Sequence, residues 1–459
     1  MSRQLQTDRR VKDHIEGKLK TTQHLEVGLL LGAVGQGAKE TLLQLVPTPT
    51  EEGQQPVVTL TSASTQGASS KSKSSKAQTG IKVDNASLNL HASLVINLLP
   101  GGLALIGAYF LGPAAANDQA FLELSRLKLN PDAGAFWTAV LCIDSSSGKA
   151  IYQAASASAR PRQSPVPCEL KYGPMLENLQ SVTCRYPLQS QLPVHCNGKQ
   201  MISQIKRLVA EESNRISSGL VFLGRECCQN SNKGLHELVP AASQTSLEAI
   251  LLSSPSCCAT AGTTASEESA GCLAVQGALH GLAFCHKRAS LPEVANCLKA
   301  DLRKTLAYRV ALAAACAAPG EELEAGSTSQ CQPAFTALSD AHASRADLML
   351  PSRVTLPYQE PVLFCDYLQP GEETTAAAER IQWALPCAQA DPALVAASES
   401  PAQTIMSTVR PASKLSGKRS STDALLGLYL RWVIAAVATV FLAIALTIYF
   451  LSTQPSSIR

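Results

Sequence analysis

Residues 24–46 read HLEVGLLLGAVGQGAKETLLQLV, and this stretch is the most informative about the structure of the first half of the chain. It holds two short apolar runs, His24–Gly32 and Glu40–Val46, which are separated by the glycine-rich segment AVGQGAK. Short apolar runs bounded by turn residues are typical of buried β-strands, and a glycine-containing connection pairs such strands as a hairpin. The sequence therefore predicts two paired strands that are buried in a core.

The glycine-rich segment superficially resembles a phosphate-binding loop. Such a loop ends in Gly-Lys-Ser/Thr, because the lysine contacts the phosphates and the hydroxyl contacts magnesium. Here the order is Gly37-Ala-Lys39-Glu40, and Gly35-x-Gly37 lacks the third glycine of a dinucleotide-binding turn. We therefore interpret the segment as a hairpin turn and expect no cofactor.

Further elements follow along the chain. Leu103–Leu111 is another buried strand by its apolar run, and Asp118–Lys128 is predicted to be a helix with Asn117 as its N-cap. Thr138–Ile143 and Ala150–Ala154 lie on either side of a turn sequence and predict a second hairpin. Strands and helices are thus expected to mix in one unit.

The second half predicts a unit of its own around a long helix. Ser290 and Glu293 form a capping box, and an apolar stripe at helical spacing continues from there until Pro319-Gly320. The strands expected around this helix are Leu273–His286, Arg353–Leu356 and Pro361–Tyr367. Polar stretches that predict linkers are 61–80, 160–167, 253–269 and 389–421. The fold class expected for the chain is α+β (α/β).

The composition limits the classes of function. The chain has 459 residues, enough for two or three domains, and 45% of them are apolar, so a packed core is available. Lys and Arg number 39 against 36 Asp and Glu, which gives a net charge of +3. This balance gives no reason to expect nucleic-acid binding, and it favours protein partners.

The C-terminal region predicts a membrane anchor. Val433–Leu451 contains no charge over 19 residues, which at 1.5 Å per residue crosses about 30 Å of hydrocarbon. Trp432 and Tyr449 lie near its two ends, where interfacial aromatic residues are common. Basic residues such as Lys418 and Arg431 precede it, so the positive-inside rule places the bulk of the chain in the cytosol. The first 20 residues are too polar for a signal peptide, so we expect a tail-anchored protein.

Fifteen cysteines would then face a reducing compartment, where structural disulfides are rare. No CxxC pair occurs, and the adjacent pairs Cys227-Cys228 and Cys257-Cys258 have poor geometry for one tetrahedral zinc ion. The glycosylation sequon at Asn85 is expected to stay unused on the cytosolic side. We therefore assign no metal-binding and no cofactor-binding residue.

A cysteine hydrolase is the alternative that the residue types leave open. Cys365 precedes Asp366, and His280 or His286 could serve as a base, with Cys285 as a second candidate nucleophile. Cys365 lies in an apolar run, however, which favours a packed core cysteine, and the Gly-x-Ser-x-Gly serine motif is absent. We therefore assign no catalytic residue and expect a protein that is not an enzyme.

Several segments together resemble one known family. They are Val27–Gly32, Leu99–Phe110, Gly277–His286 with the helix up to Cys316, and Leu350–Val354 followed by Val362–Tyr367. Their order, together with the terminal anchor, is similar to the odorant-response-abnormal protein four family of tail-anchored endoplasmic-reticulum proteins. The resemblance implies an accessory factor for multi-span membrane receptors, and the family is also associated with recruiting a ubiquitin-fold-modifier protease to the membrane.

The N-terminal segments also resemble the MPN fold of JAMM deubiquitinases, which begins with a motif similar to Glu26–Gly32. In active members a later strand leads into His-x-His, which holds a catalytic zinc, and the glutamate is the general base. Here Ile106–Phe110 continues into Leu-Gly-Pro, and His-x-His is absent from the chain. The resemblance therefore implies an inactive MPN-like domain, because Glu26 would have no metal-bound water to deprotonate.

The domains expected are an MPN-like pseudo-enzyme domain at 1–200 with a Ser/Lys-rich insert at 61–80, a second α+β domain at 201–388, a polar juxtamembrane linker at 389–432 and a transmembrane anchor at 433–451. The function that the resemblance implies is a non-catalytic adaptor of the endoplasmic reticulum membrane that assists receptor folding, trafficking or localisation. The alternatives are a membrane-anchored cysteine hydrolase and, more weakly, a tail-anchored fusion or tethering protein. The latter would need long heptad helices, which the sequence does not show.

Overall fold

The computed structural model describes residues 3–20, 25–33, 41–50, 56–62, 79–127, 137–156, 165–194, 198–238, 246–254, 271–317, 345–347, 350–359, 361–386 and 390–399. The predicted membrane span at 433–451, most of the glycine-rich turn and the Cys257-Cys258 pair lie outside these residues. Within the described ranges, no helix has both the length and the apolar character needed to cross a membrane.

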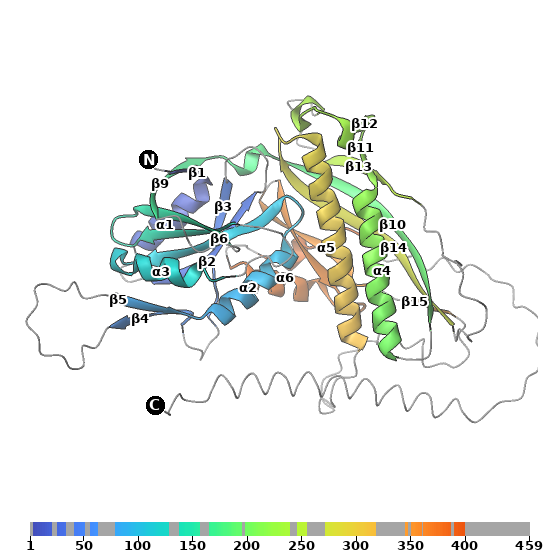
Figure 1. Cartoon of the computed structure of the whole chain (residues 1–459), viewed down its shortest axis with the longest axis horizontal. Helices are drawn as coiled ribbons and strands as arrows, with labels where there is room; N and C mark the ends of the chain where they lie inside the picture. The colour runs from blue at the N-terminus through green and yellow to red at the C-terminus, as the bar shows by residue number, and fades with distance from the viewer. Residues whose placement is uncertain are drawn as a thin grey trace, which may run out of the picture.

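The N-terminal region is a closed barrel with the strand order β1-β3-β2-β6-β7-β8-β9 (Figure 1). The strands are β1 (Arg3–Asp8), β2 (Glu26–Ala33), β3 (Thr41–Pro47), β6 (Leu103–Gly112), β7 (Trp137–Asp144), β8 (Ala150–Ser156) and β9 (Val166–Gly173). The helices of this region are α1 (Arg9–Lys20), α2 (Asn85–Leu98) and α3 (Asn117–Leu124). β2 and β3 are antiparallel, as are β7 and β8, so both predicted hairpin pairings are confirmed.

The apolar run of β2 is continuous because both faces of the strand are covered. Leu29 and Leu31 pack into a cluster that includes side chains of α2 and α3. Leu30 points the other way, into a second cluster that includes Leu45 and Tyr109. Alternate side chains of a strand point to opposite faces, so an unbroken apolar run is what two covered faces require.

A second sheet has the order β12-β11-β13-β10-β14-β15. Its strands are β10 (Leu179–Val194), β11 (Leu220–Leu223), β12 (Glu226–Cys227), β13 (Leu247–Leu252), β14 (Gly271–His286) and β15 (Arg345–Asp347). β10 and β14 pair along their whole length, from Leu179 opposite His286 to Val194 opposite Gly271. Helices α4 (Gly198–Ser218) and α5 (Leu291–Ala317) lie side by side across one face of this pair (Figure 1).

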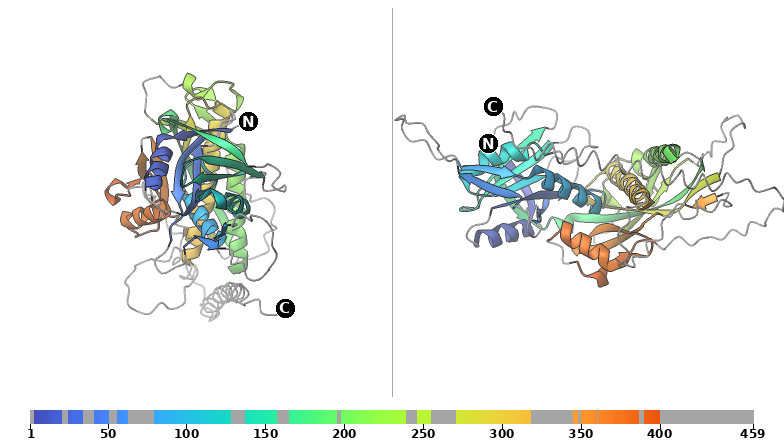
Figure 2. Two further views of the ribbon diagram at one scale, coloured as in Figure 1. Left: turned by 90° about the vertical axis from the view of Figure 1, so that its left-hand side faces the viewer. Right: turned by 90° about the horizontal axis from the view of Figure 1, so that it is seen from below.

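A small third sheet covers part of the opposite face of the second sheet, together with α6 (Figure 2). It has the order β17-β16-β18, and its elements are β16 (Ser352–Gln359), β17 (Val362–Leu368), α6 (Thr374–Ala384) and β18 (Ala396–Ala397). Outside the sheets, the hairpin of β4 (Val58–Ser62) and β5 (Thr79–Val83) flanks the predicted insert. Short 3-10 turns occupy 114–116, 176–178, 228–230, 235–237 and 392–394. The mixed α+β class is thus confirmed, as are the strands predicted around the long helix.

The helix predicted at Asp118–Lys128 differs from the one observed. Helix α3 begins at Asn117 and ends at Leu124, and Ala116 occupies the N-cap position. A 3-10 turn runs directly into the helix, so Ala116 already has a helical backbone and no extended residue is left to act as a side-chain cap. Asn117 is instead a buried residue of the first turn.

Residues 390–399, at the start of the stretch predicted as a linker, pack against the body of the protein. Ala396 and Ala397 pair with β16, and the carboxylate of Glu399 is buried. The sequence of this segment has no periodicity, because a two-residue strand is too short to produce one.

The predicted domain boundary at residue 200 falls after β10, whereas β10 belongs to the second sheet. One apolar cluster joins the two halves, since Leu282 and Phe284 of β14 pack with Val27 of the barrel. The described parts of the barrel and of the second sheet therefore share a core.

Candidate functional site

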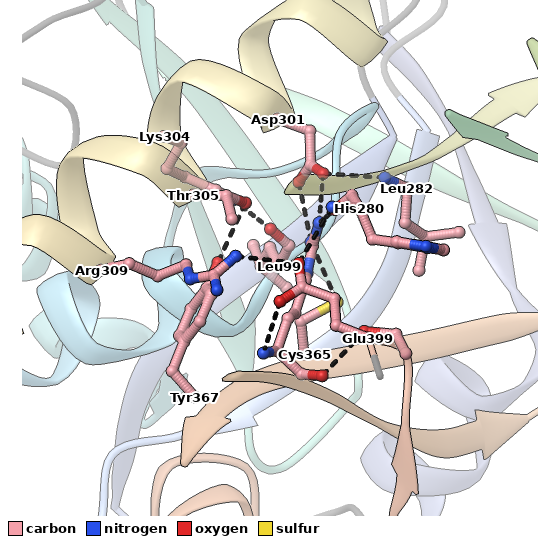
Figure 3. Close-up of polar contacts among 12 residues, drawn as sticks. Leu99, His280, Leu282, Asp301, Lys304, Thr305, Arg309, Cys365, Tyr367 and Glu399 are labelled. Carbon is pink, nitrogen blue, oxygen red and sulfur yellow. Dashed lines mark hydrogen bonds and ion pairs between the residues drawn. The ribbon is translucent and has the colours of Figure 1, made fainter. Parts of the chain in front are cut away.

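The segments that resemble the known family lie far apart in sequence but meet at the junction between the barrel, the second sheet and the third sheet. Polar contacts link the end of helix α2, strand β14, helix α5 and strands β16 and β17 there (Figure 3). We call this set the junction cluster; it comprises Leu99, His280, Leu282, Asp301, Lys304, Thr305, Arg309, Arg353, Cys365, Tyr367 and Glu399.

The centre of the junction cluster is an ion pair between Arg353 of β16 and Asp301 of α5. Arg353 Nη1 lies 2.6 Å from Asp301 Oδ2, and Nη2 lies 3.0 Å from Oδ1, so the contact is bidentate. Asp301 Oδ2 also accepts from the backbone N–H of Leu282 at 2.8 Å. Both side chains are almost fully buried. Burial opposes the charge on Arg353, but Asp301, Cys365 and Tyr367 together outweigh this effect and hold the pKa of Arg353 well above its usual value.

Glu399 makes a second charged contact beside this pair. Its Oε1 accepts from Arg309 Nη1 at 2.8 Å and from the backbone N–H of His280 at 3.0 Å, while Oε2 lies 3.4 Å from the backbone N–H of Arg353. Each side chain of this Arg309–Glu399 pair is 6% exposed. One carboxylate thus connects α5, β14 and β16 to the segment that follows β18.

Lys304 connects α5 to the end of α2. Its Nζ donates to the carbonyls of Leu99 and of Ile96, the latter at 3.2 Å. A cation is favourable there because the last carbonyls of a helix carry partial negative charge. Burial lowers the pKa of Lys304, and Asp301 opposes this effect.

Close backbone contacts explain why two glycines occur in the sequence Leu99-Pro-Gly-Gly that follows α2. The backbone of Gly101 pairs with β14: its N–H donates to the Leu282 carbonyl at 2.9 Å, and its carbonyl accepts from Phe284 N–H at 2.8 Å. A Cβ on Gly101 would lie 2.4 Å from the carbonyl oxygen of Cys297 in α5. Gly102 has φ +78°, and a Cβ there would lie 2.0 Å from the Phe284 carbonyl oxygen. Larger residues would therefore separate the barrel from the second sheet.

Cys365, the first candidate nucleophile of the alternative cysteine hydrolase, lies against Arg353. Cys365 and Asp366 are neighbours on β17, and Asp366 Oδ2 accepts from Arg380 Nε at 2.8 Å. Cys365 Sγ accepts from Arg353 Nη2 at 3.1 Å, and burial raises the pKa of the Cys365 thiol. A raised pKa disfavours the thiolate that a nucleophile needs. Among the described contacts, the His280 ring forms no hydrogen bond to Cys365.

The second candidate nucleophile, Cys285, is buried at the end of β14. Its thiol contacts Cys297 of α5, and this contact, together with burial, raises the pKa of Cys285. His286 Nδ1 accepts from the backbone N–H of Arg288 at 3.1 Å. The described contacts therefore place a cysteine, not a histidine, beside Cys285.

Glu26, the position that resembles the general base of MPN enzymes, is fully engaged in structural contacts. Its Oε1 accepts from Tyr109 of β6 at 2.6 Å and lies 2.8 Å from His14 Nε2, and Oε2 contacts Lys18 Nζ. Burial acts to raise the pKa of Glu26, but these contacts outweigh it and lower the pKa to about 2. The carboxylate thereby fastens α1 to β2 and β6.

Metal-ligating residues do not gather in the part of the chain that the structure describes, where no group of three or more His, Cys, Asp and Glu could hold an ion. Cys227 and Cys228 diverge: Cys228 is buried, and Cys227 Sγ donates to Gln229 Oε1 at 3.6 Å. The cysteines whose side chains the structure describes are free thiols.

Sequence reasoning missed the charged members of the junction cluster. Asp301 falls on the buried stripe of α5, one residue before Leu302 and three after Leu298. A carboxylate on an apolar stripe is a signal that a buried partner exists, because an isolated buried charge is very unfavourable. Arg353 precedes the buried Val354 in a strand, so it is a charge of opposite sign in another apolar segment.

No curated protein matches the chain in sequence. Among solved structures, it is similar to the crystal structure of UfSP from C. elegans, with 9% identity and a TM-score of 0.38; the match covers 84% of this chain and 56% of that one. The chain thus spans little more than half of the length of UfSP. It is also similar to the solution structure of a protein from Salinibacter ruber, with 14% identity, a TM-score of 0.19, and coverage of 37% of this chain and 92% of that one.

The sequence model of the ODR4-like family (odorant response abnormal 4-like) matches residues 28–393 of the chain. This range includes most of the described barrel, the second sheet and every member of the junction cluster except Glu399. The family resemblance that the sequence segments indicated is therefore confirmed, and the chain belongs to the ODR4-like family.

Proposed function

We propose that this chain is a non-catalytic adaptor of the endoplasmic reticulum membrane. It would help multi-span receptors to fold, traffic or localise, and would recruit a ubiquitin-fold-modifier protease to the membrane. The observation that carries the proposal is that segments typical of the family meet in the junction cluster, where buried ion pairs join α5 to the third sheet and hydrogen bonds join it to β14 and to the end of α2. The contacts described there fix the relative positions of these elements, and a protein that binds a partner needs such a fixed surface.

The barrel would act as an inactive MPN-like domain that pairs with a similar domain of the protease. Two observations support this part. Glu26 is held by Tyr109, His14 and Lys18 instead of facing an open site. In addition, burial raises the pKa of Cys365, which disfavours a reactive thiolate at the most plausible alternative site.

Affinity purification from detergent-solubilised membranes tests the adaptor role. We expect the full-length chain to recover the protease and receptor clients, and a chain lacking Val433–Leu451 to recover the protease from the soluble fraction without the receptors. Absence of the protease from the full-length sample would overturn the recruitment proposal. Membrane association of the truncated chain would overturn the anchor.

A double Cys285→Ser, Cys365→Ser variant tests the absence of catalysis. Serine keeps an acceptor for Arg353, so the variant is designed to stay folded, and its abundance is measured alongside. We expect receptor trafficking and protease recruitment to match those of the unmodified chain. Loss of both in a folded, abundant protein would favour the hydrolase instead.

A further inference from the structure

Residues 390–399 return to the body of the protein after α6. Ala396 and Ala397 lie opposite Thr355 and Val354 and extend the third sheet by one short strand. Ser398 continues the contact, since its backbone N–H and its Oγ both donate to the carbonyl of Arg353, at 3.2 and 2.8 Å. We call residues 391–399 the C-terminal strap.

The apolar contacts of the C-terminal strap are few. Ala396 and Ala397 are exposed, and the Leu394 side chain is 52% exposed. Val395 packs only partly against the apolar clusters beneath it. Glu399, in contrast, is among the most buried carboxylates described. A segment with few buried apolar contacts opens at low free energy, so the Glu399 carboxylate is the main attachment.

Release of the C-terminal strap would leave a site with two properties. The edge of β16 would expose backbone groups that can pair with another extended segment. The buried charges beneath would be Arg309 and Arg353 against Asp301, a cationic excess that requires an anion. Within the described residues, the Nε groups of Arg309 and Arg353 already lack a hydrogen-bond partner.

A cavity of about 110 Å³ lies beside this edge. Ser398 of the strap forms part of its wall, so the strap closes one side of the cavity. The residues that line it are Thr183, His280, Gly281, Leu282, Arg353, Thr355, Leu363 and Ser398. Strap release would therefore enlarge an existing hollow next to the cationic groups.

From these contacts we propose that the edge of β16 and Arg309 form a peptide-binding site that the C-terminal strap occupies in cis. The site takes an extended segment with two small residues followed, two positions later, by an acidic side chain. A partner with this chemistry displaces the strap by pairing with β16 and placing its carboxylate against Arg309. This inference concerns a site separate from the barrel, and it does not rest on the identity of any adaptor partner.

Hydrogen exchange of the full chain tests the role of Glu399. We expect Glu399→Gln to increase amide exchange about tenfold or more in the strap and along β16, because the charged contact with Arg309 is lost. Glu379→Gln, an exposed site on α6, is the matched control and should leave exchange unchanged. Ser398→Ala removes one strap hydrogen bond without changing a buried charge, and it should also increase amide exchange in the strap. The proposal can therefore still be tested if the Glu399 variant folds poorly. Unchanged strap exchange in both variants overturns the proposal.

A labelled peptide with the sequence of residues 390–401, ADPALVAASESP, tests binding in trans. We expect it to bind the full-length Glu399→Gln chain, and the same peptide with glutamine at the position of Glu399 to bind roughly tenfold more weakly. The unmodified chain should bind the peptide far less, because its own strap competes at an effective concentration on the order of mM. Equal affinity of the two peptides, or no binding of either, overturns the proposal.

Discussion

Replacement of Glu26 by glutamine removes a negative charge from a site where three donors converge. The Glu26 side chain is 11% exposed and contacts His14, Lys18 and Tyr109. Burial raises the pKa of this carboxyl, but the contacts lower it from 4.5 to about 2. Glutamine preserves the size of the side chain but cannot form the ion pair with Lys18, so the variant isolates the contribution of the charge.

The pKa sets the size of the expected effect. The difference between 4.5 and about 2, at 1.36 kcal/mol for each pH unit, corresponds to roughly 3 kcal/mol of folding free energy at neutral pH. Because the pKa is lower in the folded state, this stability is present above pH 4.5 and is lost as the pH falls towards 2. At pH 3.5 roughly 2 kcal/mol of it should remain. We therefore expect Glu26→Gln to lower the free energy of unfolding by roughly 3 kcal/mol at pH 7 and by less at pH 3.5.

Urea unfolding followed by circular dichroism at pH 7, 5 and 3.5 measures this effect. Glu16→Gln is the matched control, because Glu16 lies on the same helix α1 but is 52% exposed and only pairs with Lys12 at 3.6 Å. An exposed pair of this kind contributes less than about 1 kcal/mol. A difference between Glu26→Gln and the unmodified chain that does not change with pH would rule out an electrostatic origin, since lost packing does not titrate.

Three further predictions concern the junction. Arg353→Met should lower the free energy of unfolding by about 3–5 kcal/mol, because it leaves Asp301 buried without its partner. The double variant that also carries Asp301→Leu should regain part of this stability in the same urea assay. Gly101→Ala should cost about 1–3 kcal/mol, measured as a lower thermal midpoint, because the new Cβ meets α5; a midpoint equal to that of the unmodified chain would contradict the described contact. Iodoacetamide at pH 8 should leave Cys365 unmodified until the protein unfolds, because burial raises the pKa of its thiol. The partly exposed Cys227 should react in the native state, and mass spectrometry of the labelled chain measures both outcomes.

Elements with a continuous apolar run or a long capped apolar stripe, such as α5, could be predicted from the sequence, whereas the amphipathic helices α1 and α4 were missed. The side chains of β2 and β6, and those of 281–285 in β14, are mostly buried on both faces, so these stretches are apolar without interruption. Helix α1 buries only Val11 and Ile15 among basic and acidic residues, so its sequence holds too few apolar positions to indicate a buried helix face. Helix α4 has a spaced stripe that includes Ile205, Leu208 and Ile216, which the search for helical periodicity could have found.

The junction cluster could not be assembled from the sequence, because its contacts are remote along the chain. Asp301 and Arg353 are 52 positions apart, and Glu399 reaches His280 over 119 positions. A single sequence reveals that a charge occupies an apolar stripe but does not reveal which distant charge meets it. The family segments were recognisable separately, yet their common location depends on the pairing of β10 with β14 and on the docking of β16.

The shared core has a consequence for synthesis of the protein on the ribosome. The imidazole of His91, in helix α2, donates to the carbonyl of Ala384, which is 293 positions later. At translation rates of about 5–20 residues per second, this acceptor emerges roughly 15–60 s after its donor. During this interval the apolar faces of the barrel and of α2 are not yet covered by their later partners. Nascent chains are therefore expected to depend on chaperones until residue 399 has left the exit tunnel, and shortened products that end before α6 should be cleared by quality control.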